Sequence, residues 1–439
     1  MTIECSEEVG LLDALDAARP LIYTPRRGRK FLYCNESLLR VVVLRMLSNR
    51  EHNIDFLNDL KSSKQGRIIC GIASTPSAAT YSRFLKVLAA LRDLLWQVMM
   101  AVNLRINAAV AAGRETGGFA DDTPPLGEIL AIDSTDIPAY SVCRYSPHID
   151  TDVKKSKNPE RCKSPNPDCC ARDCVDPDAQ WGFKTNKNAP NGKGLCFGYK
   201  LHAIVDAYYG TVLHVIFLPA NESDTDQLIP LMSELLKMYP RLAPKYLLAD
   251  KGYDSVGNCV WLDSKSIIPI IAVRRPREDN EENRRHEIEI EGPYGRYIQE
   301  VNFNGYLVCA GNRLMEYAGT DAERGHLFRC AKGGCRLNKK TMFPIYCEGE
   351  TWVKPEGKAL RVIGRIPQFT KRWKRLYRLR QTVERFFSSA KRSRLMNVQK
   401  YLTMGKVDMH AAMSVLSYGA TMLARLLVGD YERMRHMRV

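Results

Sequence analysis

The chain has 439 residues, of which 45% are hydrophobic and 26% are charged. This is enough apolar material for a sizeable core, so a wholly disordered chain and a disulfide-stapled miniprotein are both excluded. Lysine and arginine (65) outnumber aspartate and glutamate (49), which gives a net charge of +16. Such an excess in a large folded protein indicates a polyanionic partner, with nucleic acid ahead of an anionic membrane.

Two features of the sequence argue against a membrane or secreted protein. The best uncharged apolar run, 411–424, ends at Arg425 and is too short to span a bilayer. The first ten residues carry acids and no basic n-region, unlike a secretory signal. The 14 cysteines are therefore expected to be reduced thiols or metal ligands. We expect a cytoplasmic, nucleoid-associated protein with no membrane partner.

The N-terminal part of the chain, 1–115, favours helices. Its longest segment, 82–112, lacks Gly and Pro and is rich in Ala, Leu and Met. The Gly/Asp/Pro-rich stretch 113–127 then predicts a linker.

The pattern changes to short apolar strands after this linker. Strands are predicted at 128–137, 197–210, 211–220, 245–250 and 266–273, with the second and third forming a hairpin. A helix is predicted at 224–239, where Asp224 and Gln227 form a capping box, and another near 255–264. Strands that alternate with helices predict a mixed α/β fold with a five-stranded sheet.

The C-terminal half begins with a β-rich insertion, indicated by short alternating runs between Arg274 and Gly364. Residues 368–404 contain no Gly or Pro and predict one long helix or two in succession, followed by a helix at 406–428. The predicted division is 1–120 (helical domain), 121–275 (first part of the core), 276–364 (β-rich insertion) and 365–439 (C-terminal helices of the core).

Three acidic residues stand out by their positions. Asp133 lies within the first predicted strand, Asp250 ends a later strand, and Glu384 lies on the predicted basic helix. Carboxylates at such strand positions are costly unless they have a partner. Hard divalent cations accept carboxylate and phosphate oxygens, so these acids fit a two-magnesium site for phosphoryl transfer.

The helix around Glu384 carries a second pattern. Tyr377, Arg380, Glu384 and Lys391 are spaced so that one continuous helix would hold them within an arc of about 60°. Residues 371–394 contain ten Lys or Arg and one acid. Such a face is suited to holding a metal ion and the phosphates around a scissile bond.

These motifs resemble those of bacterial insertion-sequence DDE transposases. The spacing Tyr377-x2-Arg380-x3-Glu384-x6-Lys391 is similar to the tyrosine–arginine–glutamate–lysine signature of that family. The blocks LAIDST, FGYKLH, LPANESDTDQL and LLADKGYDS resemble, in the same order, the blocks around the family's two aspartates. The resemblance covers roughly 128–273 and 370–428.

The resemblance implies a ribonuclease H-like core that cleaves transposon ends and transfers them to target DNA. It implies that Asp133, Asp250 and Glu384 bind Mg²⁺ or Mn²⁺. It also implies that Tyr377, Arg380 and Lys391 contact the backbone of double-stranded DNA. Because two ends must be joined to one target, we expect a homodimer on DNA. Two other functions stay open: an endonuclease of the same fold without strand transfer, and a non-catalytic, domesticated DNA-binding protein.

Several residues have alternative interpretations. Asp136 or Asp254 could replace the two chosen aspartates. Glu384 could form only an ion pair with Arg380, worth about 0.3–0.5 kcal/mol. Trp352 could stack on a base or serve as a buried anchor.

Two further points are left open: whether the protein binds structural zinc, and which segment recognises the sequence of the DNA ends. Two cysteine groups are candidates for zinc: Cys162, Cys169, Cys170 and Cys174 in a loop, and Cys309, Cys330, Cys335 and Cys347 in the insertion. The helices of 1–115, with the basic stretch at 25–30, are expected to read end sequence or to form a dimerisation bundle.

Overall fold

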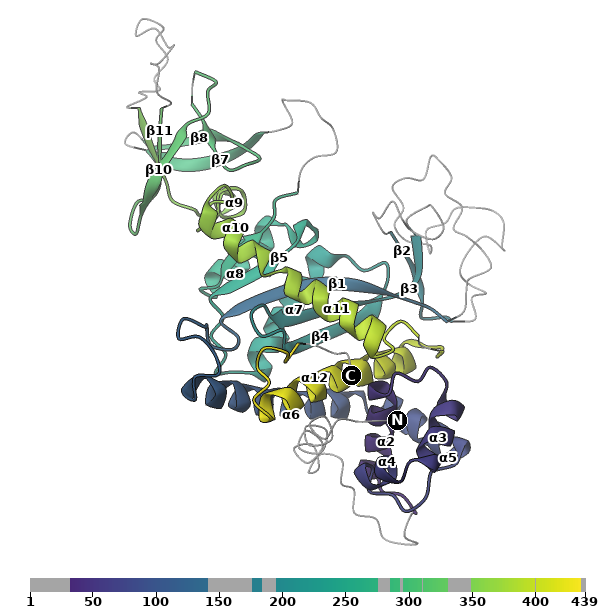
Figure 1. Ribbon diagram of the computed structural model, residues 1–439. Helices are drawn as coiled ribbons and strands as arrows, with labels where there is room; N and C mark the ends of the chain where they lie inside the picture. Colours follow the sequence, from purple (N-terminus) through teal and green to yellow (C-terminus); the bar gives the residue numbers. More distant parts are fainter. Residues whose placement is uncertain are drawn as a thin grey trace, which may run out of the picture. The chain divides into compact units, whose positions relative to one another are not determined.

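The computed structural model describes residues 32–140, 176–183, 195–274, 285–292, 295–309, 311–330, 349–398 and 400–435 (Figure 1). The chain forms two compact units. Unit 1 comprises Met1–Leu126, Asp133–Ser223 and Thr382–Val439, and unit 2 comprises Gly127–Ile132 and Asp224–Gln381. Each unit is therefore assembled from segments that lie far apart in the sequence.

The central sheet has six strands in the order β2-β3-β1-β5-β6, with β4 paired to β3. The strands are β1 (Ile129–Pro138), β2 (Gln180–Phe183), β3 (Leu195–Asp206), β4 (Val212–Pro219), β5 (Tyr246–Ala249) and β6 (Ile268–Ile271). The β3–β4 pair is antiparallel, which confirms the predicted hairpin, whereas β5 runs parallel to both β1 and β6. The fold is thus mixed α/β, as predicted.

The sheet has one strand more than the five predicted. The additional strand, β2, has four residues and pairs with the first residues of β3 from Leu195 to Gly198. So short a segment carries too little alternation to be recognised as a strand in the sequence.

In unit 1 the long helix α12 (Met404–Leu427) packs against α6, α2, α5 and β4. The N-terminal helices of unit 1 are α2 (Asn35–Leu47), α3 (Asn53–Ser62), α4 (Lys64–Ile69), α5 (Ala78–Ala90) and α6 (Arg92–Glu115). The predicted continuous segment 82–112 is interrupted at Leu91, whose ψ of 42° is not helical. No Gly or Pro marks this break.

One part of α6 has the length and composition of a membrane-spanning helix, namely Leu94–Glu115. This segment packs against α12 and β4. The Asn103 side chain donates a hydrogen bond to the backbone oxygen of Val212 over 2.8 Å, which joins α6 to β4. The apolar face of α6 is therefore explained by core packing.

Two aspartates cap the N-terminus of α12. The Asp176 carboxylate accepts hydrogen bonds from the Tyr199 hydroxyl (2.8 Å) and the backbone N–H of Thr403 (3.2 Å). Asp178 accepts one from the N–H of Met404 over 2.9 Å. Negative side chains at this end of a helix satisfy unpaired N–H groups and complement the helix dipole.

In unit 2 the helices α7 (Asp224–Met238) and α8 (Val256–Ser264) pack against each other, and α8 also packs against α9 (Lys358–Val362). The insertion forms two three-stranded sheets, β7-β8-β9 and β10-β11-β12. Their strands are Arg285–Gly292, Gly295–Asn302, Leu307–Val308, Glu316–Asp321, Gly325–Arg329 and Glu350–Val353. A shared apolar core that includes Ile288, Phe328 and Val362 holds these sheets to α9.

The basic segment forms two helices in succession, α10 (Lys371–Arg378) and α11 (Gln381–Ser393). They are separated at Leu379 and Arg380, where the N–H of Arg380 bonds to the oxygen of Tyr377 over 3.1 Å. Of the four signature residues, Tyr377 lies in the last turn of α10, Arg380 lies in the short interruption, and Glu384 and Lys391 lie on α11.

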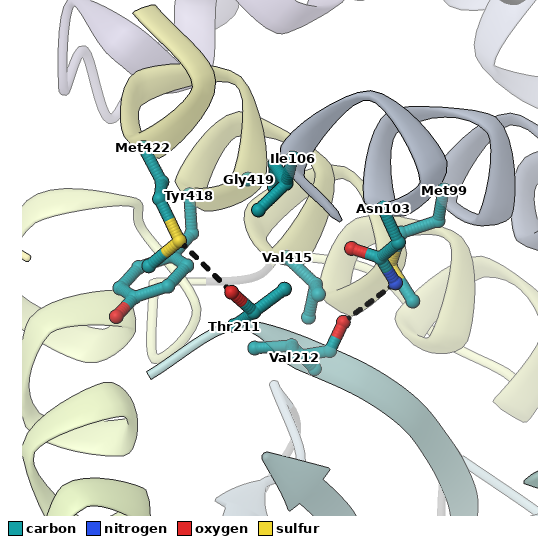
Figure 2. Close-up of a pocket in the computed structure, with 9 residues that line it drawn as sticks. All are labelled: Met99, Asn103, Ile106, Thr211, Val212, Val415, Tyr418, Gly419 and Met422. Carbon is teal, nitrogen blue, oxygen red and sulfur yellow. Dashed lines mark hydrogen bonds between the residues drawn. The ribbon is translucent and has the colours of Figure 1, made fainter. Parts of the chain in front are cut away.

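A small cavity lies between α6, α12 and β4 (Figure 2). Its lining includes Gly419 of α12, and a Cβ added there would lie 3.4 Å from Cγ1 of Val102 and 4.0 Å from Cδ1 of Ile106. These are ordinary van der Waals distances, so the site can accept a methyl group.

We predict that Gly419→Ala raises the free energy of unfolding by about 1 kcal/mol, because alanine is the better helix former and its Cβ fits the space. Urea denaturation measures this change. The opposite sign is expected for Gly113→Ala in α6, where the added Cβ would lie 2.6 Å from the Tyr431 ring. A destabilised Gly419→Ala variant would contradict the packing described for α6 and α12.

Candidate active site

The parallel pairing of β1 and β5 determines where two of the predicted acids lie. The register pairs Ile132 with Ala249, and Asp133 and Asp250 each directly follow one of these residues. The two aspartates therefore occupy equivalent positions on neighbouring strands, which are about 4.8 Å apart in a sheet. Both side chains are partly exposed, unlike the buried apolar residues before them.

Asp250 begins a tight turn that is fixed by α7 and α8. Its Oδ1 accepts a hydrogen bond from the N–H of Gly252 over 2.6 Å, at the start of the 3₁₀ helix η4 (Lys251–Tyr253). The Thr225 hydroxyl of α7 donates to the oxygen of Gly252 over 2.7 Å. The Asn258 amide of α8 donates to the oxygens of Thr225 and Tyr253. These hydrogen bonds thus fix the backbone turn that carries the Asp250 carboxylate.

The carboxylate of Asp224 also lies at this turn. A Cβ built on Gly252 would lie 2.7 Å from Oδ1 of Asp250 and 3.2 Å from Oδ2 of Asp224. The sequence pattern predicted only a capping role for Asp224, at the start of α7. Nothing in the spacing of the capping box indicated that this residue lies beside Asp250.

The alternative residue Asp254 has a structural partner. Arg361 of α9 donates two hydrogen bonds to its carboxylate, of 2.8 and 2.7 Å, and the N–H of Arg274 donates a third of 2.7 Å. The Asp254 side chain is 1% exposed. The hydrogen bond to Asp254 also raises the pKa of the Arg361 guanidinium. This carboxylate therefore joins the insertion to the core rather than facing solvent.

The other alternative, Asp136, lies three residues after Asp133 on β1. Side chains alternate between the two faces of a strand, so these two carboxylates point to opposite faces. The backbone oxygen of Asp136 accepts a hydrogen bond from Nζ of Lys391 over 2.8 Å. This bond joins α11 to β1 within unit 1.

Glu384 is exposed on α11. The helix is anchored by its other face, where Val383, Phe386 and Phe387 are buried. The Thr382 hydroxyl donates to the backbone oxygen of Ala207 over 2.8 Å. Because the opposite face of α11 is buried, the Glu384 side chain points away from the core of unit 1.

Tyr377 and Arg380 form an aromatic stack with Trp373 in unit 2. The rings of Trp373 and Tyr377 are 4.6 Å apart and nearly parallel, at 13°. The Arg380 guanidinium lies 5.5 Å from the centroid of the Tyr377 ring. Five bases of α10 are exposed: Lys371, Arg372, Lys374, Arg375 and Arg378. By contrast, Arg394 at the end of the basic segment is buried and bonds to Thr421.

Asp133 and Asp250 offer carboxylate oxygens, which are the donors that a hard divalent cation takes. A Cβ built on Gly252 would lie against oxygens of Asp250 and Asp224, so this turn is closely packed. Within the described ranges, no group of three or more His, Cys, Asp or Glu forms a ready-made metal cluster. A divalent cation held by the two aspartates would therefore need further oxygens from outside this pair.

The predicted zinc ligands fall largely outside the described residues. This applies to Cys162, Cys169, Cys170 and Cys174 and to Cys335 and Cys347, as it does to the basic stretch at 25–30. Cys309 and Cys330 lie within the described residues, and both are partly buried. Trp352 is partly buried, and the Arg324 guanidinium lies 5.7 Å from the centroid of its ring.

Comparison with known proteins decides the family. The model of the transposase DDE domain matches residues 124–418, which is more than half of the chain. The protein belongs to the transposase DDE domain family. This confirms the resemblance to insertion-sequence DDE transposases.

Two individual proteins are also similar to this chain, at lower coverage or lower identity. A Burkholderia cepacia protein described as a transposase for insertion sequence element IS402 is 39% identical over 83 residues. That alignment covers 18% of this chain and 39% of the relative. A solved piggyBac transposase synaptic complex with hairpin DNA is 11% identical, with a TM-score of 0.37 over 97% of this chain and 80% of that one.

We predict that Arg361→Met lowers the free energy of unfolding by about 3 kcal/mol, because the buried Asp254 carboxylate loses its charged partner. Denaturant titration of the 439-residue protein measures the change. Arg365→Met is the matched control, since Arg365 forms the same bidentate pair with Asp263, but both side chains are more exposed. The control should cost at most about 1 kcal/mol. Equal losses in the two variants would contradict the structural role of Asp254.

Proposed function

We propose that this protein is a metal-dependent DNA transposase that cleaves the ends of an insertion sequence and joins them to target DNA. Asp133, Asp250 and Glu384 are the carboxylates that carry the reaction. The observation that supports this most strongly is the β1–β5 register, in which both aspartates directly follow the pair of Ile132 and Ala249. Membership in the transposase DDE domain family supports the same reaction class.

The topology of the sheet supports a ribonuclease H-like core. An antiparallel hairpin, β3–β4, adjoins the strand that carries the first aspartate. The parallel strands β5 and β6 follow on its other side, with α7 and α8 as their connections. Asp250 follows the carboxyl end of β5, the edge at which open α/β sheets bind ligands, and the register brings Asp133, within β1, to the same level.

The spacing along α11 supports Glu384 as the third carboxylate. Lys391 bonds to the backbone of Asp136, and Glu384 lies seven residues before Lys391. Asp133 lies three residues before Asp136. Seven residues of helix and three of strand both span about 10 Å, so α11 can bring Glu384 alongside Asp133.

Asp133, Asp250 and Glu384 would hold a divalent cation, Mg²⁺ or Mn²⁺. A bound cation of this kind would supply charge that activates the attacking oxygen and stabilises the leaving oxygen of a phosphodiester. The chain's own contribution is to fix the carboxylates. Asp250 is held by its bond to Gly252, and α11 is held by Thr382 and Lys391. Such preorganisation lowers the cost of reaching the reactive geometry.

Contacts to the DNA backbone are assigned to the basic helices. Tyr377, Arg380 and Lys391 remain part of this proposal, and the five exposed bases of α10 extend it. The helices of 1–115 are proposed to read the end sequence. Two active sites on one target imply a homodimer on DNA, and such a protein acts in the cytoplasm at the nucleoid.

We predict that Asp133→Asn, Asp250→Asn and Glu384→Gln each abolish strand cleavage, because each removes a charged ligand of the metal. DNA affinity should persist, since the basic surface is unchanged. The assay uses labelled element ends with target DNA and reports cleavage and joining separately. Asp136→Asn is the matched control on the opposite face of β1 and should retain cleavage. Cleavage by Asp250→Asn at the normal rate would refute the proposed site, and cleavage without joining would indicate a nuclease.

We predict that Lys374→Ala and Arg375→Ala each reduce the slope of log affinity against log salt by about 0.9, because each removes one phosphate contact. Fluorescence anisotropy of labelled end DNA at several salt concentrations gives this slope. Lys237→Ala, which removes an exposed lysine of α7, should leave the slope unchanged. An unchanged slope in the α10 variants would mean that this helix is a solvated face.

A further inference from the structure

The basic helix α10 is held to unit 2 by Trp373. This side chain is buried, whereas the other residues of α10 are exposed or partly exposed. The backbone N–H of Trp373 donates to the hydroxyl oxygen of Thr370, the N-cap of the helix, over 3.2 Å. The helix packs against β5 and β6. The indole of Trp373 is therefore fixed both by packing and by the helix cap.

A hydrogen bond also joins the start of α10 to the strand that precedes Asp250. The Arg372 guanidinium donates to the hydroxyl oxygen of Tyr246 over 2.9 Å. Tyr246 is the first residue of β5 and is buried. The position of α10 is thus defined relative to β5, and all of these residues belong to unit 2.

Tyr377 rests on this fixed indole. Residues four apart on a helix lie on the same face, and the rings of Trp373 and Tyr377 are 4.6 Å apart at an angle of 13°. The Arg380 guanidinium lies 5.5 Å from the centroid of the Tyr377 ring. A phenol that lies against an indole has fewer rotamers available than one in solvent. Trp373 therefore restricts Tyr377, and Tyr377 in turn restricts Arg380.

We infer that Trp373 is a positioning residue, which holds Tyr377 and Arg380 in the orientation in which they bind the phosphates of DNA. The inference rests on the proposed function and extends it by one residue that does not touch DNA. Side chains that are ordered before binding lose less conformational entropy when they bind. The stack therefore strengthens DNA binding through Tyr377 alone. A general anchor of α10 would instead act on all the bases of the helix.

A double-mutant cycle separates these two roles. The affinity of the 439-residue protein for labelled end DNA is measured by fluorescence anisotropy at one salt concentration. Trp373→Leu removes the indole, Trp373→Phe keeps an aromatic ring, and Tyr377→Leu removes the group on which the indole acts. Tyr306→Leu is the matched control, because Tyr306 stacks on Phe369 in the same unit, at 4.1 Å and 20°.

We expect Trp373→Leu to weaken DNA binding about three- to tenfold, the range that corresponds to the loss of one aromatic pair. Trp373→Phe should bind within about twofold of wild type, because an aromatic ring still supports Tyr377. In the Tyr377→Leu protein, Trp373→Leu should change the affinity by less than about 1.5-fold. The control should stay within the same limit.

A second measurement needs no change at Trp373. Protein with isotope-labelled tyrosine rings is studied by NMR, and the Tyr377 signal is assigned by its loss in Tyr377→Leu. Stacking on the indole should shift this signal upfield in the free protein, and the shift should persist with DNA bound. A Tyr377 signal at an unstacked position in the free protein would overturn the inference, even if Trp373→Leu does not fold.

The outcomes also distinguish this inference from the proposed function. Weakened binding in Tyr377→Leu, with wild-type affinity in Trp373→Leu, would overturn the inference alone. An equal effect of Trp373→Leu with and without Tyr377 would do the same, since it would mean a general anchor. Wild-type affinity in both Tyr377→Leu and Arg380→Ala would refute the proposed DNA contacts, and the inference with them.

Discussion

The parallel pairing of β1 with β5 is the constraint on which the rest of the site depends. Four consecutive residue pairs, ending at Ile132 and Ala249, fix the register of two buried strands. A shift by one residue would turn Asp133 into the opposite face of the sheet. The burial of these apolar residues on both faces therefore also positions the polar residues that follow them. The same backbone pairing therefore serves the stability of the core and sets the register of Asp133 and Asp250.

Side-chain hydrogen bonds join several elements that follow these strands. Thr225 and Asn258 hold the turn after Asp250, and Lys391 holds α11 to β1. Arg361 of α9 holds Asp254, which lies just before α8. These bonds join residues that lie between 27 and 255 positions apart in the sequence.

The sequence allowed much of the core to be predicted, because apolar strands and the alternating hairpin leave a local pattern. It did not reveal the break at Leu91, which contains no Gly or Pro. For 368–404 it left open one helix or two in succession, and the structure has two, α10 and α11. The pairing of Asp254 with Arg361 joins residues 107 positions apart and leaves no local signal. Asp224 was assigned only a capping role, because its position beside Asp250 exists only after α7 packs on the turn. Long-range contacts, not local propensities, account for these differences.

A crystal structure of the 439-residue protein grown with MnCl₂ and end DNA, with the metal located by anomalous scattering, tests the central claim most directly. The β1–β5 register predicts a manganese peak bounded by carboxylate oxygens of Asp133, within β1, and Asp250, just after β5. A bound manganese ion elsewhere, with these two aspartates on different faces of the sheet, would contradict the account.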